Sequence, residues 1–317
     1  MRALLIYFAL AMQQIERIIF FGTPLFAATI LEALILQKRP IVAVVTAPDK
    51  AAGRGLKAHT SAVKQIAEKY NLPVLQPEKL KSEDFLTALK AYHADLQIVI
   101  AFRMLPEQVW NMPKLGSMNL HASLLPAYRG AAPINWAIIN GETETGLTTF
   151  ILQHQIDTGN IIRQVNMPIL PEDNAGSLHD KMMHVGAAIV AESIECIDQG
   201  QYESKPQPAG EFPHAPKLNN DNCLIHWALP AIKVHNLIRG LSPYPGAYCL
   251  HKDKHIKIHK SQLTNLPSSN PGHFEMANKH QLVVHCADYC LEILELQVEG
   301  KKKMNATEFI NGFQSLI

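Results

Sequence analysis

Short apolar runs alternate with helix-periodic segments from residue 17 to residue 200, and no other feature constrains the fold as much. The apolar runs are too short for helices, and the segments between them repeat apolar residues at helical spacing. Strands that alternate with helices predict a mostly parallel sheet with helices on both faces, a Rossmann-like α/β domain. The expected strands are 17–21, 41–45, 74–75, 96–101, 117–122 and 146–152, and the expected helices are 24–37, 61–70, 82–93, 132–139 and 177–197.

The pattern changes after residues 201–219, a polar stretch with four prolines that is typical of a linker. Beyond it a helix over 231–239 is expected to end at Gly240. Closely spaced short strands then predict a small, OB-like β-barrel. The expected domains are therefore 17–200 and 220–317. The expected strands of the second are 247–250, 255–259, 273–276, 282–286 and 291–298.

Residues 1–16 are expected to be a non-structural extension, with Met12 as a possible start. Its apolar run is shorter than a secretory signal of ~15–30 residues and too short to cross a bilayer. The chain's five cysteines lack C-x-x-C spacing. They predict neither a disulfide framework nor a zinc site, and they favour the reducing cytoplasm. A net charge of +1 excludes a uniformly basic nucleic-acid coat but permits one basic face.

Asn119 and His121 stand two residues apart in the expected strand 117–122, so their side chains point to one face. Asp157, in an Asp-Thr-Gly sequence, follows the next strand, from where its carboxylate could reach the imidazole. Taken alone, each residue has a structural explanation in strand packing or turn formation. An aspartic protease would need a second such carboxylate, and the sequence has no second copy.

Nucleotide-binding loops are disfavoured by the glycine pattern. Gly22 follows the first strand without a Gly-x-Gly-x-x-Gly motif. Gly53-Arg54-Gly55 follows the second strand without the Lys-Ser/Thr pair of a phosphate-binding loop. A nicotinamide dehydrogenase is therefore not expected.

The surroundings of Asn119 and His121 resemble the folate-dependent formyltransferases. The run from Asn119 through Ser123-Leu124-Leu125-Pro126 to Arg129-Gly130-Ala131-Ala132-Pro133 carries the superfamily resemblance. Phe21-Gly22-Thr23-Pro24 and the loop from Pro48 to Gly55 are similar to the members that act on initiator methionyl-tRNA. The resemblance extends from about residue 17 to the end of the chain. One difference is that the loop Phe102–Pro106 is one residue shorter than is common beside the folate pocket.

The resemblance implies an enzyme, a transferase that moves a formyl group from 10-formyltetrahydrofolate to the α-amine of initiator methionyl-tRNA. The product, N-formylmethionyl-tRNA, serves translation initiation in the cytoplasm. Asn119 and protonated His121 would stabilise the oxyanion, and Asp157 would favour the imidazolium and help to move the amine proton. No metal is required, and a monomer is expected. The implied folate contacts are Ser123, Leu124, Leu125, Pro126 and Phe102.

Basic residues suggest where tRNA binds. Residues 213–317 carry a net charge of +3, whereas residues 1–212 carry −2. Small barrels commonly bind nucleic acid through basic strands and loops. By the resemblance, Arg54 is the main contact with the acceptor end, and Arg129 meets either the folate carboxylate or an RNA phosphate. The expected tRNA contacts are Lys50, Arg54, Lys57, Arg129, Arg239 and Lys257.

Three alternatives stay open at this point. A formyltransferase acting on a small amine would not need a basic second domain. A non-catalytic RNA-binding relative would not need Asn119, His121 and Asp157 together. A hydrolase of formylated folate would use water in place of the amine.

Overall fold

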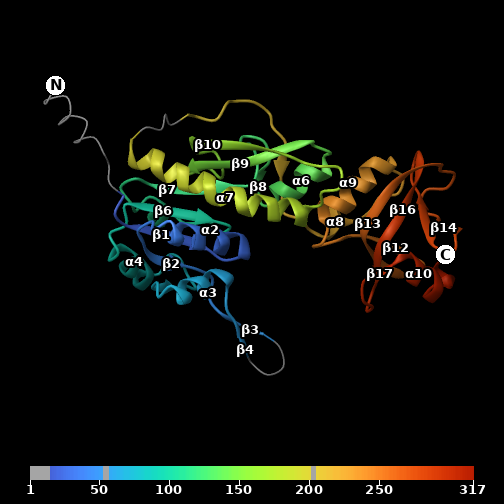
Figure 1. Ribbon diagram of the computed structural model, residues 1–317, viewed down its shortest axis with the longest axis horizontal. Coiled ribbons are helices and arrows are strands. Elements are labelled where there is room, and N and C mark those ends of the chain that lie inside the picture. Colours follow the sequence, from blue (N-terminus) through green and yellow to red (C-terminus); the bar gives the residue numbers. More distant parts are fainter. Residues whose placement is uncertain (1–14, 53–56, 201–204) are drawn as a thin grey trace. The chain divides into compact units, whose positions relative to one another are not determined.

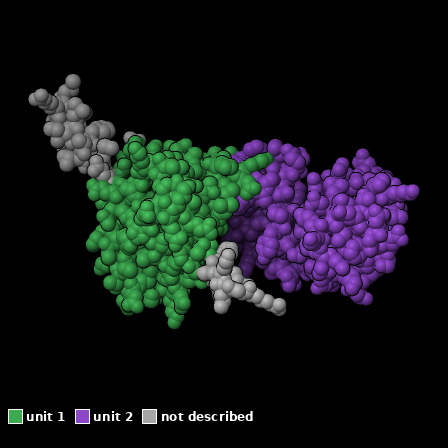
Figure 2. Space-filling view, turned by 60° about the horizontal axis from the view of Figure 1, so that its bottom comes forward, with its two compact units in different colours: residues 1–129, 146–166, 180–212 green, residues 130–145, 167–179, 213–317 purple. Residues whose placement is uncertain are grey.

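A computed structural model describes residues 15–52, 57–200 and 205–317 of the chain (Figure 1). The chain divides into two compact units, coloured separately in Figure 2. The first unit consists of residues 1–129, 146–166 and 180–212, and the second of residues 130–145, 167–179 and 213–317. The residues expected to form an N-terminal extension lie, up to residue 14, outside the described residues.

A seven-stranded sheet with the order β10-β9-β7-β6-β1-β2-β5 organises the first unit. The strands β5, β2, β1, β6 and β7 run parallel to one another, and β9 runs antiparallel to β7. The expected α/β architecture with a mostly parallel sheet is confirmed. The strands are β1 (Ile18–Gly22), β2 (Ile41–Val45), β5 (Val74–Leu75), β6 (Leu96–Ile100), β7 (Ser117–His121), β9 (Glu144–Ile151) and β10 (Ile161–Pro168).

Both faces of this sheet are covered. Ile19 and Phe21 of β1 pack in a cluster with Phe85, Leu89 and Val109 from two helices on one face. The intervening residues of β1 point to the opposite face and are also fully buried. The helices are α2 (Leu25–Leu36), α3 (Ala62–Lys69), α4 (Glu83–Lys90), α5 (Glu107–Trp110) and α7 (Ala175–Asp198).

Two strand features differ from the sequence expectation. β3 (Lys50–Ala52) and β4 (Lys57–His59) pair as an antiparallel hairpin where only a loop was expected. β10 was not expected either, because polar residues interrupt its apolar residues without alternation and only one of its residues is buried, which leaves no clear strand pattern to mark it.

The second unit contains a six-stranded antiparallel sheet with the order β12-β13-β16-β15-β14 and with β17 beside β16. The five expected strands are present, and β13 is longer than expected because it continues through a bulged stretch after Ile258. The strands are β12 (Ala247–His251), β13 (Lys254–Pro267), β14 (Phe274–Asn278), β15 (Gln281–His285), β16 (Tyr289–Val298) and β17 (Met304–Asn305).

Helices and short connections complete the second unit. α9 and α10 contribute Val234, Ile238 and Phe309 to the same buried apolar cluster as the sheet. A two-stranded sheet joins β8 (Arg129–Gly130) to β11 (His214–Ala215). The helices are α6 (Pro133–Ile139), α8 (Asn220–Cys223), α9 (Ala231–Leu241), α10 (Ala306–Gly312) and a 3₁₀ turn over Gln314–Leu316.

The prediction that Gly240 ends its helix is wrong. α9 continues to Leu241 and is capped at Ser242, just before Pro243. Gly240 instead allows close packing of α9 on α6. A Cβ there would lie 2.6 Å from the Ile139 side chain and 3.1 Å from the backbone oxygen of Asn135.

Candidate active site

β7 presents Asn119 and His121 on one face near its carboxyl end, where parallel sheets commonly carry their active residues. Hydrogen bonding on both sides fixes this strand. Asn119 is in register with Val99 of β6 and Phe150 of β9, and His121 with Thr148 of β9. The Asn119 side chain is half-buried, and the described part of the chain offers its amide no hydrogen-bond partner. The amide is therefore available to a substrate.

The imidazole of His121 is only 7% exposed, and oxygen atoms face both of its nitrogens. Its Nε2 lies 2.8 Å from the carbonyl oxygen of Tyr128. A carbonyl oxygen only accepts, so Nε2 carries a proton. Nδ1 lies 3.9 Å from Oδ2 of Asp157, beyond hydrogen-bond distance but close enough for an ion pair. The sequence prediction that Asp157 reaches the imidazole agrees with this separation.

Tyr128 holds the histidine through an unusual backbone conformation. Its φ of 61° lies in the left-handed region, which a bulky side chain rarely adopts. The surrounding structure must impose that conformation, and it directs the Tyr128 carbonyl toward His121. Sequence reasoning missed this residue because its contribution comes from the backbone.

Asp157 sits in a tight turn after β9, with a φ of 54°. Asp tolerates this left-handed conformation better than most residues. Gly159, two residues later, lies so close to β9 that a Cβ would stand 1.7 Å from the Ile151 carbonyl oxygen. Only glycine fits there, and this close approach sets the position of the turn that carries the carboxylate.

Arg129 and Gln207 hold the same turn from outside. Gln207 Nε2 donates to the carbonyl oxygens of Asp157 at 2.8 Å and of Gly159 at 2.9 Å. Arg129 Nε donates to the Asp157 carbonyl at 3.1 Å and to Gln207 Oε1 at 3.0 Å. Arg129 is thus bound within the site, and its contact with tRNA stays a prediction. Sequence reasoning missed Gln207, since a lone glutamine in a proline-broken stretch carries no signal.

The loop from Ser123 to Pro126 is fixed by two residues of neighbouring strands. Thr148 Oγ1 donates to the Ser123 carbonyl at 2.6 Å and accepts from the Leu125 N–H at 3.1 Å. Gln164 Nε2 donates to the Leu125 carbonyl at 2.9 Å. Ser123 is fully buried and donates its own hydroxyl to the Ala127 carbonyl at 2.6 Å. Any folate contact of this loop is therefore expected from its apolar side chains and from backbone groups other than those already hydrogen-bonded to Thr148 and Gln164.

Phe102, the remaining expected folate contact, is half-buried at the end of β6. Its ring meets Phe21 edge-on at a centroid distance of 5.6 Å. The neighbouring Arg103 donates to the carbonyls of Pro77 and Glu78, which anchors the shortened loop to the segment after β5. The loop therefore has a fixed conformation of its own.

The expected tRNA contacts differ in how far the structure describes them. Arg54 and the side chains of Lys50 and Lys57 lie outside the described residues. Arg239 is half-buried and donates to the carbonyls of Leu170 and Asp173, and burial lowers the pKa of its guanidinium. Lys257 Nζ donates to the Pro245 carbonyl at 2.8 Å.

Within the described ranges, no cluster of three His, Cys, Asp or Glu could hold a metal ion. No helix in those ranges has both the length and the apolar composition that a membrane crossing needs.

Comparison with known proteins adds independent information. The formyl transferase family model matches residues 16–194, and the model of the formyl transferase C-terminal domain matches residues 217–314. Methionyl-tRNA formyltransferase of Bacteroides fragilis is 49% identical over 307 residues, which cover 94% of this chain and 95% of that protein. The Flavobacterium johnsoniae enzyme of the same name is 48% identical over 301 residues, 93% of this chain and 96% of that protein.

Among solved structures, HypX from Aquifex aeolicus in complex with tetrahydrofolic acid superimposes with a TM-score of 0.64. It is 18% identical, and the match covers 93% of this chain and 48% of HypX, so the chain spans about half of that protein. That likeness shows the fold. From the family models and the relatives that are nearly half identical along the whole chain, we conclude that the chain belongs to the methionyl-tRNA formyltransferases of the formyl transferase family.

Proposed function

We propose that this chain transfers the formyl group of 10-formyltetrahydrofolate to the α-amine of initiator methionyl-tRNA, giving N-formylmethionyl-tRNA and tetrahydrofolate. The observation that carries the proposal is the pairing of an available Asn119 amide with the His121–Asp157 ion pair. Relatives named methionyl-tRNA formyltransferase support the acceptor, and HypX bound to tetrahydrofolic acid supports the donor class.

The reaction replaces one C–N bond by another. The amine nitrogen attacks the formyl carbon, and negative charge develops on the formyl oxygen. The bond from that carbon to N10 of the folate then breaks, and the proton lost by the amine ends on N10. Asn119 suits the oxyanion because its amide can donate without first giving up a protein partner.

We assign separate roles in the reaction to His121 and Asp157. Because Nε2 already donates to Tyr128, the ring can donate a second hydrogen bond only from Nδ1, and only when it is protonated. Asp157 Oδ2 lies 3.9 Å from Nδ1, on the side of the ring that would carry this second proton. We assign oxyanion stabilisation to Asn119 and the imidazolium. To Asp157 we assign transfer of the amine proton toward N10, directly or through water.

The loop of Ser123 to Pro126 and Phe102 suit a flat, partly apolar pterin. Leu124 and Phe102 are half-buried, so part of each side chain is open to a ligand. Backbone groups beside them supply hydrogen bonds that fix orientation.

The second unit supports binding of a nucleic acid. Tyr248 and His255 stack at 4.3 Å and line a pocket of about 310 Å³ together with Lys257. Tyr244, at its rim, is 81% exposed. Aromatic faces beside a cation are the usual platform for an unpaired base and its phosphate. We also propose Lys50, Arg54 and Lys57 as contacts for the acceptor end, and a monomer in the cytoplasm as the working form.

A formyl-transfer assay with 10-formyltetrahydrofolate tests the acceptor. Initiator methionyl-tRNA is compared with glycinamide ribotide, free methionine and no acceptor. Formylation of the tRNA alone is the expected result. Transfer to glycinamide ribotide would replace the acceptor by a small amine, and release of formate without an acceptor would indicate a hydrolase. Failure of all transfer with tRNA binding retained would indicate a non-catalytic relative.

A further inference from the structure

A cavity of about 310 Å³ lies wholly within the second unit, a volume at the lower end of the range for small-molecule sites. It includes part of the outer face of β12 and β13, whose register places Tyr248 opposite Lys257. Residues two apart on a strand share a face, so His255 lies on the same face as Lys257, while Ile256 between them is buried in the core. The lining residues are Leu218, Asn219, Asn220, Cys223, Tyr244, Pro245, Gly246, Tyr248, His255 and Lys257.

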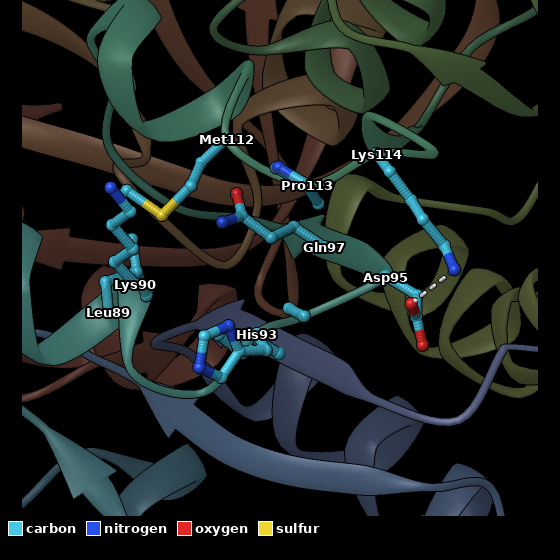
Figure 3. Close-up of a pocket in the computed structure, with 10 residues that line it drawn as sticks. Leu89, Lys90, His93, Asp95, Gln97, Met112, Pro113 and Lys114 are labelled. Atoms are coloured by element: carbon cyan, nitrogen blue, oxygen red, sulfur yellow. Dashed lines mark ion pairs between the residues drawn. The ribbon is translucent and has the colours of Figure 1, made fainter.

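A cavity of the first unit shows, by contrast, what this lining offers. Figure 3 shows Lys114 turned toward Asp95 there, with which it forms an ion pair at 2.9 Å, and no Tyr, Phe or Trp lines that cavity. The cavity of the second unit has two tyrosines in its lining and neither Asp nor Glu. Its Lys257 makes no ion pair with any residue that the structure describes. The second cavity therefore suits a flat ligand with a negative charge.

Lys257 is held in place and still keeps hydrogen-bond donors. Its Nζ donates to the Pro245 carbonyl oxygen at 2.8 Å, which uses one of the three N–H groups of the ammonium. Gly246, with a φ of 89°, leaves room for the lysine stem, since a Cβ there would lie 3.2 Å from Lys257 Cδ. The remaining N–H groups of Lys257 are suited to a phosphate oxygen.

The rings of Tyr248 and His255 form a stack that a further flat ring can extend. Their centroids lie 4.3 Å apart and their planes differ by 18°. His255 covers one face of Tyr248, and no other ring among the described residues contacts that tyrosine. Tyr244, also in the lining, is 81% exposed and supplies a second aromatic surface. Nucleobases stack on such side chains whatever their identity, because every base has two flat faces.

We propose that this cavity binds one unpaired nucleotide of the tRNA. The base stacks on Tyr248, on the face that His255 leaves open, and Tyr244 covers the base from the rim. The phosphate of the nucleotide faces Lys257. The base is unpaired because a base within a duplex has both faces covered by its neighbours in the helix. This inference rests on the proposed function, since it names the part of the proposed acceptor that the second unit holds.

Three probes separate the base from the phosphate: AMP, adenosine and ribose 5-phosphate. The full chain carries ring-¹³C tyrosine, and the signals of Tyr244 and Tyr248 are assigned by their loss in Tyr244→Leu and Tyr248→Leu. AMP is expected to shift both signals saturably with a Kd of about 1 mM, an affinity usual for so small a ligand. Adenosine and ribose 5-phosphate should each bind more weakly, and saturating initiator tRNA should displace AMP. The titration needs no formyl transfer, so its outcome is independent of the proposed activity.

Variants test the named residues. Tyr248→Leu should weaken AMP binding about tenfold through the loss of one stacking surface, with the Tyr244 signal as the readout. Lys257→Gln should weaken AMP binding several-fold by removing the cation that faces the phosphate. Tyr289→Leu and Lys260→Gln change an exposed tyrosine and an exposed lysine of the same unit outside the cavity, and both should bind AMP like the wild type. In the formylation assay, Tyr248→Leu should raise KM for methionyl-tRNA several-fold and leave KM for the formyl donor unchanged.

The proposal is overturned if AMP gives no saturable shift, if ribose 5-phosphate binds as tightly as AMP, or if saturating tRNA leaves AMP bound. AMP binding that Tyr248→Leu leaves unchanged, or that Tyr289→Leu weakens equally, would also overturn it. Should Tyr248→Leu fail to fold, Tyr244→Leu takes its place at an exposed position, with the Tyr248 signal as the readout. Unchanged AMP binding in that variant would then contradict the proposal.

Discussion

At the scale of single residues, the side chains that we propose as catalytic depend on neighbours to which we assign no chemical step. His121 is oriented by a backbone carbonyl, and the turn that carries Asp157 is held by Gln207 and Arg129. Among the described residues, Gln207 bonds only to backbone carbonyls and to Arg129, so we propose that it positions the Asp157 carboxylate.

Gln207→Leu removes both hydrogen bonds to the Asp157 turn. We expect kcat to fall about tenfold, the consequence of a misplaced catalytic group, while KM for the formyl donor stays unchanged. Steady-state kinetics of formylation measure both constants. Gln199→Leu makes the same substitution at an exposed glutamine and should leave both unchanged. An increase in KM with kcat preserved would show that Gln207 contributes to binding instead.

One feature of the site follows from the sequence because it is local. The period of two along a strand predicts that Asn119 and His121 share a face. The help from Tyr128, Thr148 and Gln207 could not be predicted, because it comes from a left-handed backbone or from hydrogen bonds between residues far apart in the chain. No local pattern encodes such pairings.

At the scale of elements, a close backbone contact sets the position of the turn that carries Asp157. Gly159→Ala would bring a Cβ against the Ile151 carbonyl and displace the Asp157 turn. We expect a loss of about 1–3 kcal/mol in the free energy of unfolding, together with a large loss of kcat. Urea unfolding and formylation kinetics report the two effects.

Gly312→Ala is the matched control for that substitution. A Cβ at Gly312 meets nothing within 4 Å, and the residue ends a helix. Alanine there should be neutral or stabilise by up to about 1 kcal/mol. Equal effects of the two substitutions would contradict the steric explanation.

His235 of α9 is expected to make the free energy of unfolding depend on pH. Burial, and then the charge of Arg239, lowers the pKa of His235 to about 4, and its Nδ1 lies 2.9 Å from Ser261 Oγ of β13. The unfolded chain therefore binds this proton first as the pH falls. The stability associated with the neutral ring is full above about pH 6.5 and is lost between that pH and about 4.

His235→Gln should remove this dependence. Between pH 7.5 and 4.5, we expect the wild type to lose up to about 2 kcal/mol more than the variant. Amide hydrogen exchange of β13 and β16 measures the free energy of opening of that sheet. His226→Gln, at an exposed histidine, should behave as the wild type. Equal acid sensitivity of His235→Gln and wild type would exclude His235 as the cause.

The elements themselves were predictable where their side chains have one clear period. β1 and β6 are buried, mostly apolar runs, and β16 alternates apolar and polar residues over much of its length, so these three strands appear in the sequence pattern. β10 could not be predicted, since its apolar and polar side chains neither alternate nor form a continuous apolar run. The helix end at Gly240 was predicted wrongly because glycine occurs both at helix ends and where two helices pack closely together.

At the scale of the whole molecule, the charge is segregated although the sum is +1. If several cations contact tRNA phosphates, KM for methionyl-tRNA should rise more than about tenfold between about 50 and 200 mM KCl, since even two released counterions suffice. KM for the formyl donor should change little. A tRNA KM that is insensitive to salt would contradict a basic tRNA surface.

The most direct test of the central claim is the single-turnover rate of formyl transfer in Asn119→Ala, with methionyl-tRNA and 10-formyltetrahydrofolate both saturating. We predict a fall of about 10²–10³-fold with tRNA affinity unchanged, as expected for loss of one oxyanion donor. Asn111→Ala, at an exposed asparagine of the same unit, should keep the wild-type rate. A wild-type rate in Asn119→Ala, or a loss confined to tRNA affinity, would contradict the assignment of this site.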